Sequence, residues 1–208
     1  MGKLRLTAHF EEAVRNIRAV MPDMSKKALK KSGFDFKSVP KLKVEHWNAY
    51  PDKTNCYDFA RNRRGHFRFP GGRDPFEGQP VHSDAHSAMF PHDDPPMDFY
   101  ALADNVREGL LRDGLIELGD KPELSERGTL VALFMGNSDD LEETGRDGDH
   151  PDIHFYALRR DGKNLVWAHK PGEKAVENLG SDPAAPFEDA PKHGDRLFGG
   201  FWLVPHRR

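Results

Sequence analysis

The chain is nearly devoid of cysteine: Cys56 is the only one among 208 residues, so no disulfide can form within the chain. No apolar run approaches the length that crosses a bilayer, and no long block of Lys and Arg offers a surface to nucleic acid. Residues 1–6 lack the apolar stretch of a secretory signal. We therefore expect a protein made in the cytoplasm, with no membrane or nucleic-acid partner; export by a system that reads no leader is the alternative.

The composition is that of one globular domain with many loops. Hydrophobic residues make up 37% of the chain and charged residues 31%, while sixteen prolines and nineteen glycines interrupt the periodic segments. The longest stretch without a period is 65–97, which is rich in Pro, Gly, His and Asp. We expect a domain over 51–208 with this loop inserted, preceded by an N-terminal helical extension over 1–50.

The order of the periodic segments predicts an α+β fold. Helical spacing of apolar residues ends before Pro22, and Ser25 is a typical N-cap for the basic run that follows it. The predicted helices are residues 8–21, 26–31, 56–64 and 99–113. Short apolar runs then predict strands over 129–135, 153–160, 163–169 and 197–204. Helices followed by neighbouring strands favour an antiparallel sheet with the N-terminal helices packed on it.

Asp161-Gly162 separates two of the predicted strands and is typical of a two-residue hairpin turn. With these residues as the turn, Arg160 faces Lys163, and His154 faces His169. Directly opposed side chains share one face of a sheet and lie roughly 4.5–5.5 Å apart at Cβ. The sequence therefore predicts two adjacent imidazoles, an arrangement in which one ring can orient the other as a base.

Three short motifs resemble those of the papain-like NlpC/P60 and CHAP cysteine hydrolases: Asn55-Cys56-Tyr57 at a helix start, His154-Phe155-Tyr156 at a strand start, and His169-Lys170-Pro171-Gly172 after the hairpin. The resemblance covers about residues 54–183 and implies a papain-like fold. It also implies that Cys56 is the nucleophile, His154 its base and His169 the orienting residue. Asn55 and Tyr57, which flank the nucleophile, are assigned to positioning and the oxyanion site.

The function implied by the resemblance is hydrolysis of an amide bond by a cysteine peptidase or amidase, with no cofactor and no metal. Peptide crosslinks of bacterial peptidoglycan are the expected substrate, and a secreted effector with a cognate inhibitor or secretion partner is the related possibility. A protein-directed acyltransferase or deamidase would use the same residues. Asp152 and Asp182 are alternatives to His169 for orienting the base, and helix capping is the alternative for Asn55.

Two alternative functions remain open, a non-catalytic binding module and a zinc-binding protein. A lone cysteine is commonly a small buried hydrophobe, in which case the chain is a non-catalytic binding module. His82, His86 and His92 form a second group, and histidines four residues apart share one face of a helix, as in zinc sites. No Glu follows the first of them in the metalloprotease pattern, so we expect a hydrated loop rather than a zinc site.

Overall fold

A computed structural model of the chain describes residues 7–8, 10–49, 54–63, 70, 99–136, 153–172, 174–193 and 197–206. The predicted loop 65–97 lies outside the described residues except for Pro70, and so do His82, His86 and His92. Among the residues that are described, no helix has the length and apolar character needed to cross a membrane.

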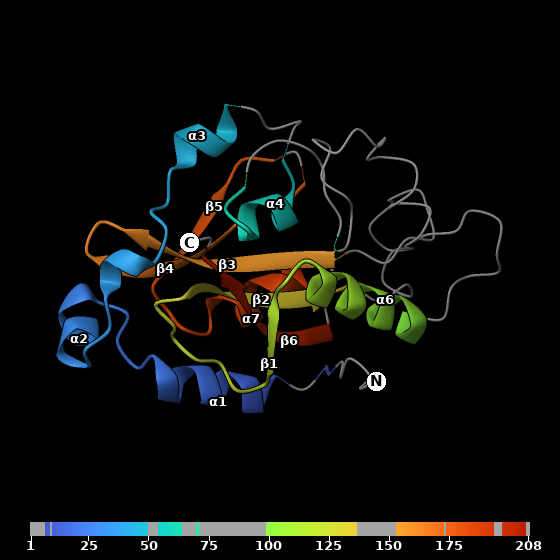
Figure 1. Ribbon diagram of the computed structural model, residues 1–208, viewed down its shortest axis with the longest axis horizontal. Coiled ribbons are helices and arrows are strands. Elements are labelled where there is room, and N and C mark those ends of the chain that lie inside the picture. The colour runs from blue at the N-terminus through green and yellow to red at the C-terminus, as the bar shows by residue number, and fades with distance from the viewer. Residues whose placement is uncertain are drawn as a thin grey trace.

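A single antiparallel sheet of six strands, in the order β1-β6-β2-β3-β4-β5, forms the centre of the molecule (Figure 1). The strands are β1 (Ile116–Gly119), β2 (Gly128–Met135), β3 (Ile153–Asp161), β4 (Asn164–His169), β5 (Glu177–Gly180) and β6 (Leu197–Pro205). The α+β class is thereby confirmed, and β2, β3, β4 and β6 are the four predicted strands. The two edge strands, β1 and β5, have four residues each and carry too short a pattern to predict.

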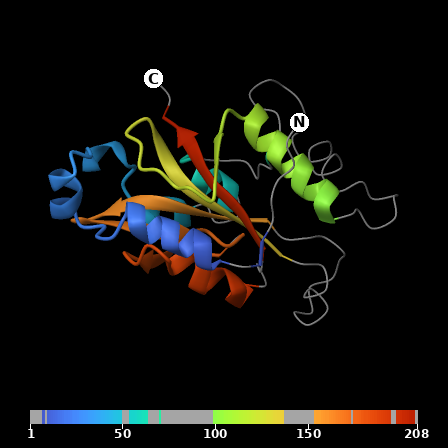
Figure 2. The ribbon, with the colours of Figure 1, turned by 90° about the horizontal axis from the view of Figure 1, so that it is seen from below.

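Helices cover both faces of the sheet (Figures 1 and 2). They are α1 (Glu11–Val20), α2 (Lys26–Lys31), α3 (Val44–Asn48), α4 (Cys56–Ala60), α6 (Phe99–Arg112) and α7 (Ala185–Asp189), with 3-10 turns η1 (Phe36–Ser38) and η5 (Ala190–His193). The helices α3, α4 and α6 share a core with one face, and α1, α2 and α7 share a core with the other.

The alternation of side chains along each strand separates these two cores. On the first face, Leu133 and Phe155 pack with apolar residues of α3, α4 and α6; on the second, Phe134 and Tyr156 pack with those of α1, α2 and α7. Both β2 and most of β3 are buried on both faces, which explains the continuous apolar run of β2. The N-terminal segment contributes buried residues to both cores, so it packs against the sheet rather than apart from it.

Local signals account for the start and end of α4. The Asn55 side chain accepts a hydrogen bond from the Asp58 N–H (2.9 Å) and caps the helix. Asn62 adopts a left-handed backbone conformation (φ 53°) and its N–H bonds to the Phe59 carbonyl, which ends the helix. The helix therefore stops at Ala60, and the prediction that it reaches residue 64 is wrong.

The β3–β4 hairpin is formed, but the predicted register is wrong by two residues, because the turn lies one position later than predicted. Asp161 pairs with Asn164 and Tyr156 with His169, so the turn residues are Gly162 and Lys163. Gly162 has a positive φ (53°), as the first turn position of a type II′ hairpin requires. The shift moves His154 from directly opposite His169 to the diagonal position, and it leaves both histidines on the same face.

Gly128, the first residue of β2, leaves no room for a side chain. A Cβ added there would lie 2.6 Å from Leu203 Cγ and 2.7 Å from the Val204 carbonyl oxygen. Because the backbone cannot move aside cheaply, we expect Gly128→Ala to lower the free energy of unfolding by about 1–3 kcal/mol in urea denaturation. Gly199→Ala is the matched control, since its Cβ would meet only the Leu133 side chain (2.8 Å). Equal losses for the two variants would contradict this explanation.

Candidate functional site

A group of polar side chains gathers where β3 begins and β4 ends, on the face of the sheet covered by α7. The group comprises His154 and Tyr156 of β3, His169 of β4, Glu177 of β5, Asp189 of α7 and His193 of η5. We call it the histidine cluster. His154 and His169 were predicted as site residues and Tyr156 belongs to the same motif as His154, whereas Glu177, Asp189 and His193 come from segments to which the sequence assigned no role.

His154 and His169 make the shortest contact in the histidine cluster. Nε2 of His154 lies 2.6 Å from Nδ1 of His169, and the two rings are nearly perpendicular at a centroid distance of 4.8 Å. Both side chains are buried: His154 is 5% exposed and His169 is 0% exposed. The structure thus brings together the two imidazoles that the sequence placed side by side, although through a diagonal rather than a direct pairing.

The other nitrogen of His169 faces carboxylates. Nε2 is 3.4 Å from Asp189 Oδ2 and 3.7 Å from Glu177 Oε2, yet it is buried and makes no well-directed hydrogen bond to any described residue. Burial lowers the pKa of His169, and the charges of Asp189 and Glu177 oppose this shift. A lowered pKa favours a neutral ring, which carries one proton and one lone pair.

Asp189 is held between several donors. The Tyr156 hydroxyl donates to Oδ2 at 3.2 Å, His193 Nε2 lies 3.2 Å from the same oxygen, and Lys192 Nζ is 3.4 Å from Oδ1. The Tyr156 ring also stacks on His169 at 4.7 Å, with an interplanar angle of 21°. Tyr156 therefore fixes both the His169 ring and the carboxylate beside it.

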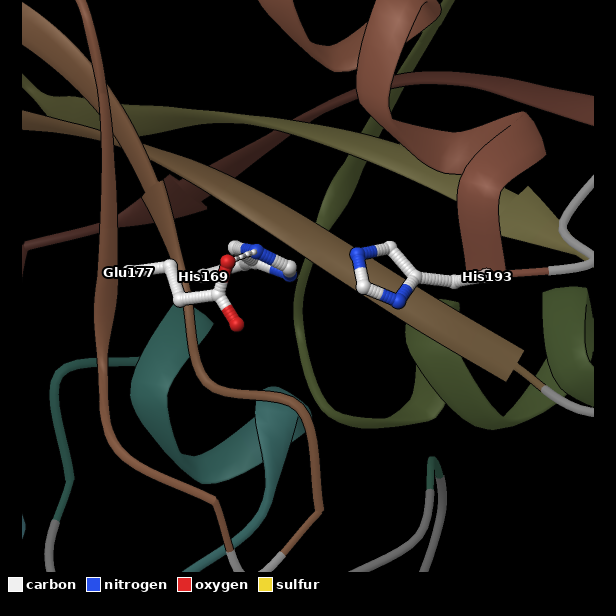
Figure 3. Close-up of side chains that lie close together, drawn as sticks. All are labelled: His169, Glu177 and His193. Atoms are coloured by element: carbon white, nitrogen blue, oxygen red, sulfur yellow. Dashed lines mark ion pairs between the residues drawn. The ribbon is translucent and has the colours of Figure 1, made fainter.

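His169, Glu177 and His193 converge on one point (Figure 3), and one potential ligand atom of each lies within 4.8 Å of the others. Glu177 lies beside His169, and the His193 ring faces them from the end of η5. Glu177 is the most exposed of the three, with 46% of its side chain accessible, against 24% for His193. The convergence point is therefore open to solvent on the Glu177 side.

Cys56 lies on the opposite face of the sheet from the histidine cluster. Its side chain packs with Ile153 and Phe155, and Sγ donates to the Ile153 carbonyl oxygen at 3.4 Å. Alternation along β3 turns these residues to the face covered by α4 and turns His154 to the other face. The structure therefore does not bring the predicted nucleophile and its predicted base into hydrogen-bond contact.

The thiol is nevertheless at the same end of β3 as His154. The β3–β4 pairing stops at Tyr156, so residues 153–155 have no β4 residue beside them. Lys170 follows β4 and donates from Nζ to the Thr54 carbonyl at 2.7 Å, which places the start of α4 beside this end of β3. Cys56 and His154 therefore lie at the same end of β3, on its two faces.

The two residues flanking Cys56 have structural partners. Asn55 caps α4, as one of its two predicted roles required. The Tyr57 hydroxyl donates to Asp113 Oδ2 at 2.6 Å, and Arg61 NH1 donates to the same oxygen at 2.9 Å. Burial, reinforced by Asp113, raises the pKa of Tyr57 well above its usual value. Neither contact is directed at the histidine cluster.

Asp189, and not Asp182, is the carboxylate beside His169. Asp182 accepts a hydrogen bond from the Ala184 N–H (2.9 Å) at the entry to α7 and lies 3.8 Å from Arg18, with half of its side chain exposed. Asp152, the other predicted alternative, lies outside the described residues. The spacing of Asp189 and His193, four residues apart on a helical segment, is the one sequence signal that could have found this part of the cluster.

No family model matches the chain, and neither the search of curated proteins nor the search of solved structures finds a match. The papain-like fold therefore has no structural neighbour to support it, and the resemblance to the NlpC/P60 enzymes rests on the sequence motifs. The geometry of the histidine cluster and of Cys56 supplies the remaining support for a function.

Proposed function

We propose that the protein is an amide hydrolase in which His154 is the general base and Cys56 the nucleophile. The observation that carries the proposal is the 2.6 Å contact between His154 Nε2 and His169 Nδ1, with Asp189 on the far side of His169. A base oriented by a second polar group is what nucleophilic catalysis by a thiol requires.

The three groups form a relay if each ring carries its proton on Nε2. His169 Nδ1 then accepts from Nε2–H of His154, and the protonated Nε2 of His169 lies 3.4 Å from Asp189 Oδ2, where the carboxylate acts through its charge rather than through a well-directed hydrogen bond. This assignment puts the lone pair of His154 on Nδ1, which is the proton acceptor in the proposed mechanism. Asp189 stabilises the positive charge that develops on the rings, as the carboxylate of a catalytic triad does.

The proposed reaction requires a rearrangement of α4 against this end of β3, because Sγ now bonds to the Ile153 carbonyl on the opposite face of the sheet from the His154 ring. His154 Nδ1 takes the thiol proton, Sγ attacks the substrate carbonyl, and the protonated ring then donates to the leaving amine as the C–N bond breaks. Water, deprotonated by the same ring, attacks the thioester and releases the acid and the free thiol. In this mechanism the Cys56 backbone N–H, at the start of α4, donates to the oxyanion.

The substrate class follows from the resemblance and not from the geometry. Peptide crosslinks of bacterial peptidoglycan are the first expectation, since the NlpC/P60 enzymes act on such bonds. One fold serves many substrates, so a protein side-chain amide is the alternative within the same chemistry.

The test is incubation of purified peptidoglycan with the wild type and with Cys56→Ala, followed by mass spectrometry of the released peptides. We expect cleavage by the wild type alone, with His206→Asn as the matched control, because this histidine bonds to Thr129 and lies away from the cluster (Nε2–Oγ1 3.2 Å). Equal cleavage by wild type and Cys56→Ala would overturn the thiol mechanism. Slow alkylation of the wild-type thiol by iodoacetamide, unchanged in His154→Gln, would contradict its activation by His154.

A further inference from the structure

We infer that His169, Glu177 and His193 form a binding site for a divalent transition-metal ion, with zinc the expected ion and Asp189 completing the ligand set. We infer further that the bound ion switches the hydrolase off. The metal site stands on its own geometry, whereas the switch rests on the proposed function. Imidazole nitrogens with carboxylate oxygens are ligands that zinc takes readily.

The separations between ligand atoms fit a tetrahedral site. Ligands at zinc bond lengths lie roughly 3.3–3.6 Å from one another in tetrahedral geometry. His169 Nε2 is 3.7 Å from Glu177 Oε2 and 3.4 Å from Asp189 Oδ2, and His193 Nε2 is 3.2 Å from Asp189 Oδ2. These three pairs are close to that spacing, while the ligand atoms of His169, Glu177 and His193 lie within 4.8 Å of one another, so an ion would draw the side chains together.

A second observation singles out His169 as a ligand. Its Nε2 is completely buried, points at the two carboxylates and has no hydrogen-bond partner among the described residues. An orphaned buried nitrogen costs free energy unless something satisfies it. Its Nδ1 already contacts His154 at 2.6 Å, and a histidine ligand typically donates its second N–H to such a partner.

Metal binding and the catalytic relay need opposite tautomers of the His154 and His169 rings. The relay requires a proton on His169 Nε2, whereas a metal requires the lone pair of that atom. When the metal displaces this proton, His169 carries its proton on Nδ1 and donates it to His154 Nε2 across the 2.6 Å contact. A neutral His154 then has its own proton on Nδ1, and it can no longer accept one from the thiol there. No proton is gained or lost by the pair, but the base is switched off.

The metal site is tested by titrating the metal-free full chain with zinc chloride in a calorimeter. We expect one ion per chain in the wild type, and affinity lowered by more than about tenfold in His193→Asn and in Glu177→Gln. His193 and Glu177 both lie beside groups of the relay, so the metal-free rate of each variant is measured and serves as its own reference for inhibition. The variant His82→Asn/His86→Asn is the control for the other histidine group and should bind zinc as the wild type does. Loss of binding in this control alone, or unchanged affinity in His193→Asn and Glu177→Gln, would overturn the site.

The switch is tested separately by measuring hydrolysis with and without zinc at saturating concentration. We expect zinc to reduce the wild-type rate by at least about tenfold and to leave His193→Asn unaffected at the same concentration. Equal inhibition of the two would overturn the switch. If the wild type binds zinc at this site but hydrolyses no amide, the metal site stands and the proposed function is rejected. Failure of the metal site and failure of the proposed function therefore give different results.

Discussion

Replacing His154 by glutamine should lower kcat for amide hydrolysis by about 10²–10⁴-fold, the usual contribution of a general base. Glutamine keeps a polar group at the start of β3, but it cannot take a proton from the thiol. His154 is 5% exposed, so solvent cannot easily replace it as the proton acceptor. The measurement is kcat on a cleaved peptide, and partial recovery of the rate by added imidazole would report the missing base.

Two further variants test whether His169 acts on its own or only by orienting His154. His169→Gln should also lower kcat, but the double variant His154→Gln/His169→Gln should be no slower than His154→Gln, because His169 acts through His154. Additive losses would show that His169 acts independently of the base. Unchanged kcat in His154→Gln would remove His154 from the mechanism altogether.

Replacing Phe134 by alanine should lower the free energy of unfolding by about 3–5 kcal/mol, the cost of removing a phenyl ring from a packed core. Phe134 is fully buried at the centre of the second core. Its ring lies 5.2–5.8 Å, centroid to centroid, from the rings of four neighbours: Phe10, Tyr156, Phe187 and Phe198. These come from the N-terminal segment, β3, α7 and β6, so one side chain ties four parts of the fold together.

Urea denaturation measures this loss, and Phe134→Leu is the matched control. Leucine keeps most of the buried volume, so we expect a loss below about 1.5 kcal/mol. The same variants also reach the site, because Phe134 contacts Tyr156, which stacks on His169 (4.7 Å). Loss of zinc affinity in Phe134→Ala, with affinity kept in Phe134→Leu, would show that this packing supports the histidine cluster. Similar unfolding free energies for the two variants would contradict a tightly packed core at this position.

Much of the secondary structure could be predicted because its causes are local. The α1 helix follows from apolar spacing and α2 from the Ser25 cap, whose side chain accepts from the Ala28 N–H at 3.3 Å. Strands β2 and β3 follow from apolar runs that only a sheet covered on both faces can bury. The hairpin register was missed because turn type depends on which residue takes a positive φ, and Asp161-Gly162 and Gly162-Lys163 both offer a glycine.

The candidate site also has one part that local sequence predicts and another that depends on tertiary packing. The observed pairing differs from the predicted one by two residues, and a shift of two preserves the alternation, so His154 and His169 share a face in both registers and the prediction that they are neighbours is confirmed. Nothing local decides which face of the sheet receives α4, nor where α7 packs. Tertiary packing placed Cys56 on the α4 face and delivered Asp189 and His193 to His169 on the other. Local pattern therefore set the imidazole pair, and long-range burial of apolar surface decided what surrounds it.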